Sequence, residues 1–106
     1  MITKDKINQI VKIIIEKYMP DKIILFGSYA KGAPQKDSDL DLLVIKDVDL
    51  PRHKRAVEIR KYLRGISTPL DILVYTNSEI KKWKDLKTSF ISNALEEGKP
   101  LYVKER

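Results

Sequence analysis

Three aspartates stand in or beside short apolar runs, where an unpaired negative charge is costly. Asp39 and Asp41 lie two residues apart at the start of the run Leu40–Ile45, and Asp71 is the second residue of the run Leu70–Tyr75. If the runs are strands, side-chain alternation puts Asp39 and Asp41 on one face. Neighbouring anions repel unless a cation lies between them, and Mg²⁺ suits that position because it takes carboxylate oxygens and keeps waters and phosphates as further ligands. The spacing therefore predicts a Mg²⁺ site at Asp39 and Asp41, which Asp71 joins if its strand lies beside theirs.

A second motif follows the apolar run Lys22–Phe26. Gly27 lets the backbone approach a phosphate closely, and Ser28 opens a short helix whose N–H groups, with the serine hydroxyl, can bind phosphate oxygens. Lys31 lies one turn further on and could neutralise phosphate charge. A phosphate cradle beside a carboxylate metal site is the minimum equipment for metal-dependent chemistry on a nucleoside triphosphate.

Each feature also has an ordinary structural interpretation. Gly27 and Ser28 alone are typical of a turn with a helix N-cap, residues 37–39 of a polar loop entering a strand, and Asp71 could be the ion-pair partner of a Lys or Arg. Their joint order and spacing favour the metal and nucleotide interpretation.

The elements that must position these residues alternate between helix and strand. Thr76 and Glu79 form a capping-box pattern that opens a helical region to about Glu97, with Trp83, Leu86, Phe90 and Ala94 expected on its inner face. The order predicts an α/β or α+β fold in one domain, residues 1–106, with helices packed on a small sheet. Apolar spacing predicts helices over 4–18, 28–31 and 52–64, and strands over 22–26, 40–45, 70–75 and 101–103.

The charge of the chain is concentrated in one segment. The 106 residues carry a net charge of +6, and segment 51–65 holds six basic residues and one glutamate. A helical wheel turns Ala56, Ile59 and Leu63 inward and Lys54, Lys61 and Arg64 outward, flanked by Arg55 and Arg60. The segment could be a solvated face, a docking site for an acidic partner or a nucleic-acid contact, and the lack of interleaved aromatic residues favours the acidic partner over nucleic acid.

The composition excludes several other classes. With no Cys and only one His, His53, the chain cannot form a disulfide scaffold, a thiolate zinc site or a multi-histidine metal site. No apolar run is long enough to cross a membrane, and the first residues lack the apolar stretch of a signal peptide, so we expect a cytoplasmic protein.

One pattern joins the two motifs: Gly27-Ser28, ten intervening residues, Asp39-Leu40-Asp41, and Asp71 on a later strand. It resembles the nucleotidyltransferases of the DNA polymerase beta superfamily, and most closely their minimal members. The resemblance covers about residues 5–103. It implies a polymerase beta-like palm, a small mixed β-sheet with flanking helices. Where many relatives have Arg after the Gly-Ser pair this chain has Tyr29, which leaves more of the phosphate neutralisation to Lys31.

The resemblance also implies an activity. An enzyme of this kind transfers AMP from ATP to an acceptor hydroxyl and releases pyrophosphate. Asp39 and Asp41 would hold two Mg²⁺ ions, Asp71 would complete the acceptor-side ion and help deprotonate the hydroxyl, and Gly27 and Ser28 would hold the β- and γ-phosphates. Many minimal nucleotidyltransferases act as antitoxins of a helical HEPN-type ribonuclease and modify a tyrosine of that toxin. The resemblance thus implies a toxin partner, in a homo- or hetero-oligomer.

Two rival functions remain open. The same fold could neutralise a partner by occlusion without catalysis, although clustered anions give a pure binder no advantage. Alternatively, segment 51–65 could make the chain a nucleic-acid-binding domain, which a salt-dependent affinity would reveal. Transfer to a small molecule is a poorer interpretation, because the chain has no room for a second, substrate-binding domain.

Overall fold

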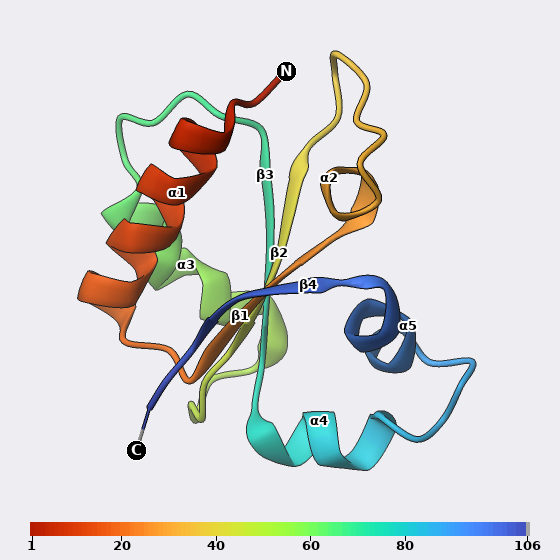
Figure 1. Cartoon of the computed structure of the whole chain (residues 1–106). Coiled ribbons are helices and arrows are strands. Elements are labelled where there is room, and N and C mark those ends of the chain that lie inside the picture. The colour runs from red at the N-terminus through yellow and green to blue at the C-terminus, as the bar shows by residue number, and fades with distance from the viewer. Residues whose placement is uncertain (106) are drawn as a thin grey trace.

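A four-stranded mixed sheet forms the centre of the computed structural model, which describes residues 1–105 (Figure 1). The strands lie side by side in the order β3-β2-β1-β4. β2 is antiparallel to β1 and parallel to β3, while β4 is antiparallel to β1 on the other edge. The bounds are β1 Lys22–Phe26, β2 Leu40–Ile45, β3 Leu70–Tyr75 and β4 Lys99–Val103.

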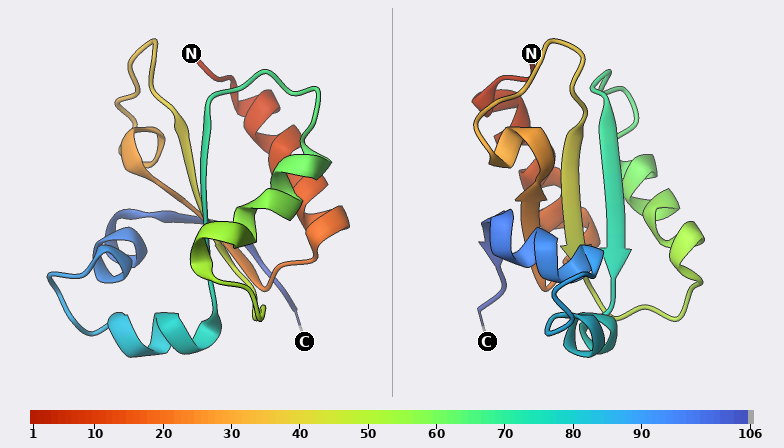
Figure 2. Two further views of the ribbon diagram at one scale, coloured as in Figure 1. Left: turned by 180° about the vertical axis from the view of Figure 1, so that it is seen from behind. Right: turned by 90° about the vertical axis from the view of Figure 1, so that its right-hand side faces the viewer.

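Helices cover both faces of this sheet. In Figure 1 and its reverse view in Figure 2, α1 and α3 lie on one side, and α4 and α5 on the other. The arrangement confirms the predicted α+β fold with a small mixed sheet. The helical elements are α1 Lys4–Ile13 with the π-helical turn η1 Ile14–Tyr18, α2 Gly27–Ala30, α3 Arg52–Tyr62, α4 Asn77–Trp83 and α5 Phe90–Glu97.

The core has two halves because side chains alternate along the strands. Leu42 and Val44 of β2 point into the half beneath α1 and α3, where Ile10, Ile14 and Ile59 are fully buried. Leu43 and Ile45 point into the half beneath α4 and α5. The even residues of β2 therefore face one layer and the odd residues, Asp41 among them, face the other.

The connection between β2 and β3 is held by an arginine of α3. Arg55 is 8% exposed, and its guanidinium donates to the Leu50 carbonyl at 2.7 Å, the Val74 carbonyl at 3.1 Å and the Glu79 carboxylate at 2.6 Å. Burying a guanidinium is favourable only when its donors are paired in this way. The helical wheel, which left Arg55 on the flank of the helix, was wrong about this side chain.

The predicted helical region from Thr76 to Glu97 is two helices. The Thr76–Glu79 capping box starts α4, as predicted, but Ser89 caps a second helix by accepting the Ser92 N–H at 3.1 Å. Leu86 lies in the turn between them and is 48% exposed, so its expected place on an inner helix face was wrong. The last strand begins at Lys99, two residues before the prediction. None of the helices in residues 1–105 has the length and apolar character needed to cross a membrane.

Candidate active site

Three separate chain segments meet at one end of the sheet. Asp41 and Asp71 are register partners on the parallel strands β2 and β3. Phe26, the last residue of β1, is the antiparallel partner of Asp41 on its other side. Register partners present their side chains on the same face, so the carboxylates of Asp41 and Asp71 share the α4/α5 face of the sheet. Asp39 precedes β2 by one residue, and strand alternation assigns it to the same face.

Gly27 is fitted against one of these carboxylates. Its backbone has φ +74°, a conformation that residues with a side chain rarely adopt, and a Cβ at this position would overlap the Asp41 carboxylate. Both the turn and the close approach therefore require glycine. The contact sets the end of β1 and the start of α2 directly beside Asp41.

The fold holds three acidic side chains, Asp39, Asp41 and Asp71, close enough together for their negative charges to repel one another. The pKa of Asp41 is raised, first by burial and then by the negative charges of Asp71 and Asp39. Asp41 is half-buried, whereas Asp39 and Asp71 are exposed. Ionising all three carboxylates at once is unfavourable without a compensating cation.

This donor set can be tested against the Mg²⁺ that the fold family implies. Carboxylate oxygens are ligands that Mg²⁺ prefers. The three carboxylates are close enough to interact electrostatically, because the charges of Asp71 and Asp39 add to burial in raising the pKa of Asp41. Within residues 1–105, however, no three acidic or histidine side chains are arranged as ligands of one ion. The residues thus fit the ion in donor chemistry and in shared face, with Asp41 and Asp71 as the directly opposed pair.

The residues expected to hold phosphates lie at the start of α2. Ser28 is half-buried in the first turn of this helix, directly after Gly27. Lys31 is its C-cap, and the Lys31 ammonium pairs with Glu97 of α5 at 3.5 Å, with 60% of the lysine side chain exposed. The structure therefore brings Gly27 and Ser28 to the carboxylates but gives Lys31 an acidic partner of its own. The roles of all three in nucleotide binding stay predictions.

Tyr29, the residue after the Gly27-Ser28 pair, contributes to the core. Its ring packs beside the α1 layer, and its hydroxyl accepts the Ile2 N–H at 2.9 Å. It ties the N-terminal segment to α2.

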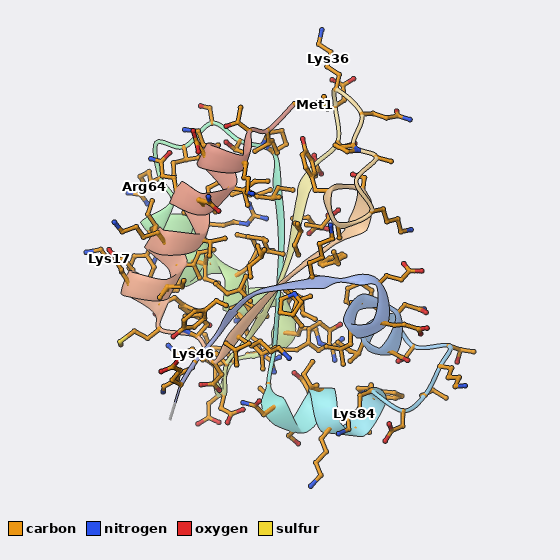
Figure 3. All side chains as sticks on the ribbon, in the orientation of Figure 1. Met1, Lys17, Lys36, Lys46, Arg64 and Lys84 are labelled. Carbon is orange, nitrogen blue, oxygen red and sulfur yellow. The ribbon has the colours of Figure 1, made fainter. Side chains whose placement is uncertain are left out.

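The basic segment 51–65 has less free charge than its composition suggests. Arg52 pairs with Glu79 at 3.5 Å, Arg55 is buried, and Arg60 donates to the Leu70 carbonyl at 3.1 Å. Lys54, Lys61 and Arg64 are exposed. Figure 3 shows Arg64 on the α1/α3 side of the sheet, whereas the carboxylates of Asp41 and Asp71 are on the α4/α5 face, so this part of the segment is separate from the candidate active site.

Sequence reasoning missed one neighbour of the carboxylates. Phe26 was assigned only to a buried strand, yet it lies opposite Asp41 on the same face and is half-buried. Alternation along β1 could have predicted this face, but the strand pairing that sets Phe26 beside Asp41 is visible only in the folded sheet.

Comparison with known proteins agrees with this geometry. Residues 7–102 match the nucleotidyltransferase domain family. A candidate protein adenylyltransferase of Methanocaldococcus jannaschii is 39% identical over 82 residues, covering 76% of this chain and 77% of the relative. The protein adenylyltransferase MntA of Thermococcus cleftensis is 31% identical over 70 residues, covering 62% of this chain and 70% of the relative.

Solved structures share the fold. A toxin–antitoxin structure with AMP-PNP has a TM-score of 0.58 and 21% identity, covering 92% of this chain and 73% of that one. A mutant MntA–HpeT toxin–antitoxin has a TM-score of 0.58 and 22% identity, covering 92% and 72%. At these identities the likeness concerns the fold alone. Because the family match takes in Gly27 and both carboxylate-bearing strands, the chain belongs to the nucleotidyltransferase domain family.

Proposed function

We propose that this nucleotidyltransferase transfers AMP from ATP to a hydroxyl group of a partner protein, and that Mg²⁺ is required. The observation that carries the proposal is the register pairing of Asp41 with Asp71, with Gly27 packed against Asp41. The names of the relatives, which are protein adenylyltransferases, support AMP as the group transferred and a protein as the acceptor.

The proposed reaction exchanges one bond to phosphorus for another. The acceptor oxygen attacks the α-phosphorus, the bond from the α-phosphorus to the α,β-bridging oxygen breaks, and pyrophosphate leaves with that electron pair. The acceptor hydroxyl must give up its proton, and Asp71, an exposed carboxylate on a different strand from Asp39 and Asp41, takes it. Gly27 and Ser28 orient the β- and γ-phosphates, and Asp39 and Asp41 hold the metal. When bound, Mg²⁺ supplies neutralisation of the charge that develops on the phosphate oxygens.

The acceptor must come from outside this sheet. We propose a toxin of the HEPN type as the partner, on the resemblance to minimal nucleotidyltransferases that act as antitoxins. The toxin–antitoxin structures that share the fold support a toxin as the partner. A hydroxyl side chain of the partner then approaches Asp71 from solvent.

The decisive experiment separates catalysis from occlusion. The protein is incubated with the partner, labelled ATP and Mg²⁺, and mass spectrometry is used to find an AMP adduct on a hydroxyl side chain. We expect Asp71→Asn to keep most of the ATP affinity and the partner binding but to lower transfer by about 10²-fold or more. Asp85→Asn, the same change at an exposed aspartate in the turn after α4, is the matched control. Neutralisation of the partner by wild type and Asp71→Asn alike, without an adduct, would show that the protein acts by occlusion.

A further inference from the structure

A small aromatic pocket lies on the same side of the sheet as the carboxylates. It has a volume of about 190 Å³ and is lined by Arg52, Tyr75, Trp83, Ser89, Phe90 and Ile91. Tyr75 belongs to β3 and faces the half of the core beneath α4 and α5, which is also the face of Asp41 and Asp71. The pocket therefore lies on the same side of the sheet as the carboxylates, but toward the other end of β3, since Asp71 is the second residue of this strand and Tyr75 the last.

Aromatic contacts connect the two places. Phe26 lies directly opposite Asp41, at the Cβ separation of about 5 Å that cross-strand partners have. The Phe26 and Phe90 rings meet edge to face with centroids 5.2 Å apart, and the Tyr75 ring lies 6.2 Å from that of Phe90. Phe26 thus connects Asp41, its cross-strand partner, to Phe90, which lines the pocket.

The pocket has the properties of a stacking site. Phe90 is 40% exposed although it belongs to an aromatic cluster, which leaves part of its ring open to a ligand. Arg52 lies over the Tyr75 ring at 4.5 Å and pairs with Glu79, so its planar guanidinium is held in place at the pocket wall. The Ser89 hydroxyl is already engaged, donating to the Trp83 carbonyl at 2.8 Å. These walls favour a flat, uncharged ring over a ligand that needs many hydrogen bonds.

We propose that this pocket binds the nucleobase of the nucleoside triphosphate, with Phe90 and Trp83 as its stacking surfaces. The inference rests on the proposed function and adds the residues that hold the base. The order of the residues along the site supports this proposal. Ser28 and Gly27 would hold the terminal phosphates, and Asp41 would lie beside the α-phosphate. Phe26 and Phe90 follow in the direction of the base. In Figure 1, α2 and α5 lie on the same side of the sheet, as this order requires. Every base has a face that can stack, so the pocket discriminates little between one nucleobase and another.

The single tryptophan of the chain gives a direct test. Because Trp83 lines the pocket, a stacked base changes its fluorescence. We expect ATP with Mg²⁺ to quench Trp83 emission saturably, and tripolyphosphate with Mg²⁺, which lacks base and ribose, to bind without quenching. Binding of both ligands is measured in parallel by calorimetry. Calorimetric binding of ATP to the wild type without any change in Trp83 emission would contradict the base site and leave the proposed function intact.

Substitution of Phe90 tests the same point without relying on fluorescence. Phe90→Leu keeps apolar bulk against Phe26 but removes the stacking ring, and we expect the Kd for ATP to rise about 5- to 100-fold. The Kd for tripolyphosphate should stay within about twofold, and circular dichroism melting checks that the variant folds. Tyr62→Leu is the matched control, because Tyr62 is 39% exposed and lies on α3, on the other side of the sheet.

Each remaining outcome decides between interpretations. Unchanged ATP affinity in Phe90→Leu together with weaker modification of the partner would assign the pocket to an acceptor side chain and overturn the proposal. Failure of wild type to bind ATP with Mg²⁺ at all would overturn both the base site and the proposed function.

Discussion

Asp41 on β2 and Asp71 on β3 are register partners in a parallel pair, so two carboxylates stand side by side on one face of the sheet. An ordinary strand pair avoids like charges at such positions because they repel. Burial and the neighbouring charges raise the pKa of Asp41, which means that the fold resists ionisation of a residue it nevertheless holds in place. We expect this arrangement to lower the stability of the free protein, and the cation of the proposed function would relieve the repulsion.

The effect of the contact between Gly27 and Asp41 can be distinguished from the effect of backbone strain by comparing Gly27 with Gly32. Gly27 and Gly32 have nearly the same positive φ, +74° and +73°, but a Cβ at Gly32 meets nothing, whereas one at Gly27 overlaps the Asp41 carboxylate. We expect Gly27→Ala and Gly32→Ala each to lose about 1–2 kcal/mol from the strained backbone. Only Gly27→Ala should also lose Mg²⁺-dependent ATP binding, measured by calorimetry. Equal ATP affinity in the two variants would mean that the Gly27–Asp41 contact has no part in the site.

If Asp39 and Asp41 hold Mg²⁺, the stabilisation of the protein by ATP should depend on Mg²⁺. In wild type, ATP with Mg²⁺ at about 100 times its Kd should raise the melting temperature by about 10 °C or more, and further than ATP alone. In Asp39→Asn/Asp41→Asn the Mg²⁺-dependent part should vanish. Without ligand, this double variant should melt at or above the wild-type temperature at pH 7, since the repulsion is relieved.

The control for this experiment is Asp37→Asn/Asp85→Asn, which makes the same change of charge at two exposed aspartates. It should respond to ATP and Mg²⁺ as wild type does. A full Mg²⁺-dependent shift in Asp39→Asn/Asp41→Asn would rule out these residues as the metal ligands.

Substitutions of Lys31 and Glu97 test whether the Lys31 ammonium, which pairs with Glu97, also binds the phosphates of ATP. Both side chains are more than half exposed, so their ion pair contributes at most about 0.5 kcal/mol to folding. If Lys31 neutralises phosphate, Lys31→Ala should weaken ATP binding, and Glu97→Gln should strengthen it by freeing the ammonium, each by a few-fold. If the Kd for ATP is unchanged in both variants, Lys31 does not bind phosphate and its only interaction is the surface ion pair with Glu97.

We expect Glu79 to make the free energy of unfolding depend on pH in the acidic range. Burial opposes its ionisation, but hydrogen bonds from Arg55 and from the Thr76 N–H outweigh burial and lower the pKa of Glu79 from 4.5 to about 2. A depressed pKa stabilises the fold above pH 4.5, and this contribution is lost as the pH falls toward 2. We expect a loss of about 1–3 kcal/mol over that range from this group, after allowance for partial exposure.

Urea unfolding at a series of pH values measures this contribution. Glu79→Gln should be less stable than wild type at pH 7, with the difference shrinking between pH 4.5 and 2, while Glu96→Gln, at an exposed position of α5, should follow wild type. A constant difference between Glu79→Gln and wild type across the range would exclude the pKa shift as its cause.

Local patterns were enough to predict the parts of the site that depend on one strand or one turn. The apolar runs that contain Asp41 and Asp71 are strands, and Gly27 does end β1 at a turn into a helix. What joined them was the resemblance to a known family, because nothing in the spacing alone specifies that β2 lies between β1 and β3.

Two predictions about side chains on helices were wrong for different reasons. Arg55 was left on a helix flank because two of its three acceptors come from β3 and α4, far along the chain. Phe90 was expected on the inner face of one long helix, but the Ser89 cap restarts the helix there and turns part of the ring outward. The deciding interactions of Arg55 with β3 and α4 are tertiary, whereas the Ser89 cap is local; helical periodicity alone predicts neither.

The pairing of β4 with β1 also bears on how the molecule folds. Ile23 lies opposite Tyr102, so this contact closes a loop of about three quarters of the chain and has a large cost in loop entropy. Shorter connections join β1 to β2 and β2 to β3. The end of the sheet that holds Asp41 and Asp71 can therefore form while one edge of β1 is still unpaired, and β4 then closes a sheet whose other three strands are already in place.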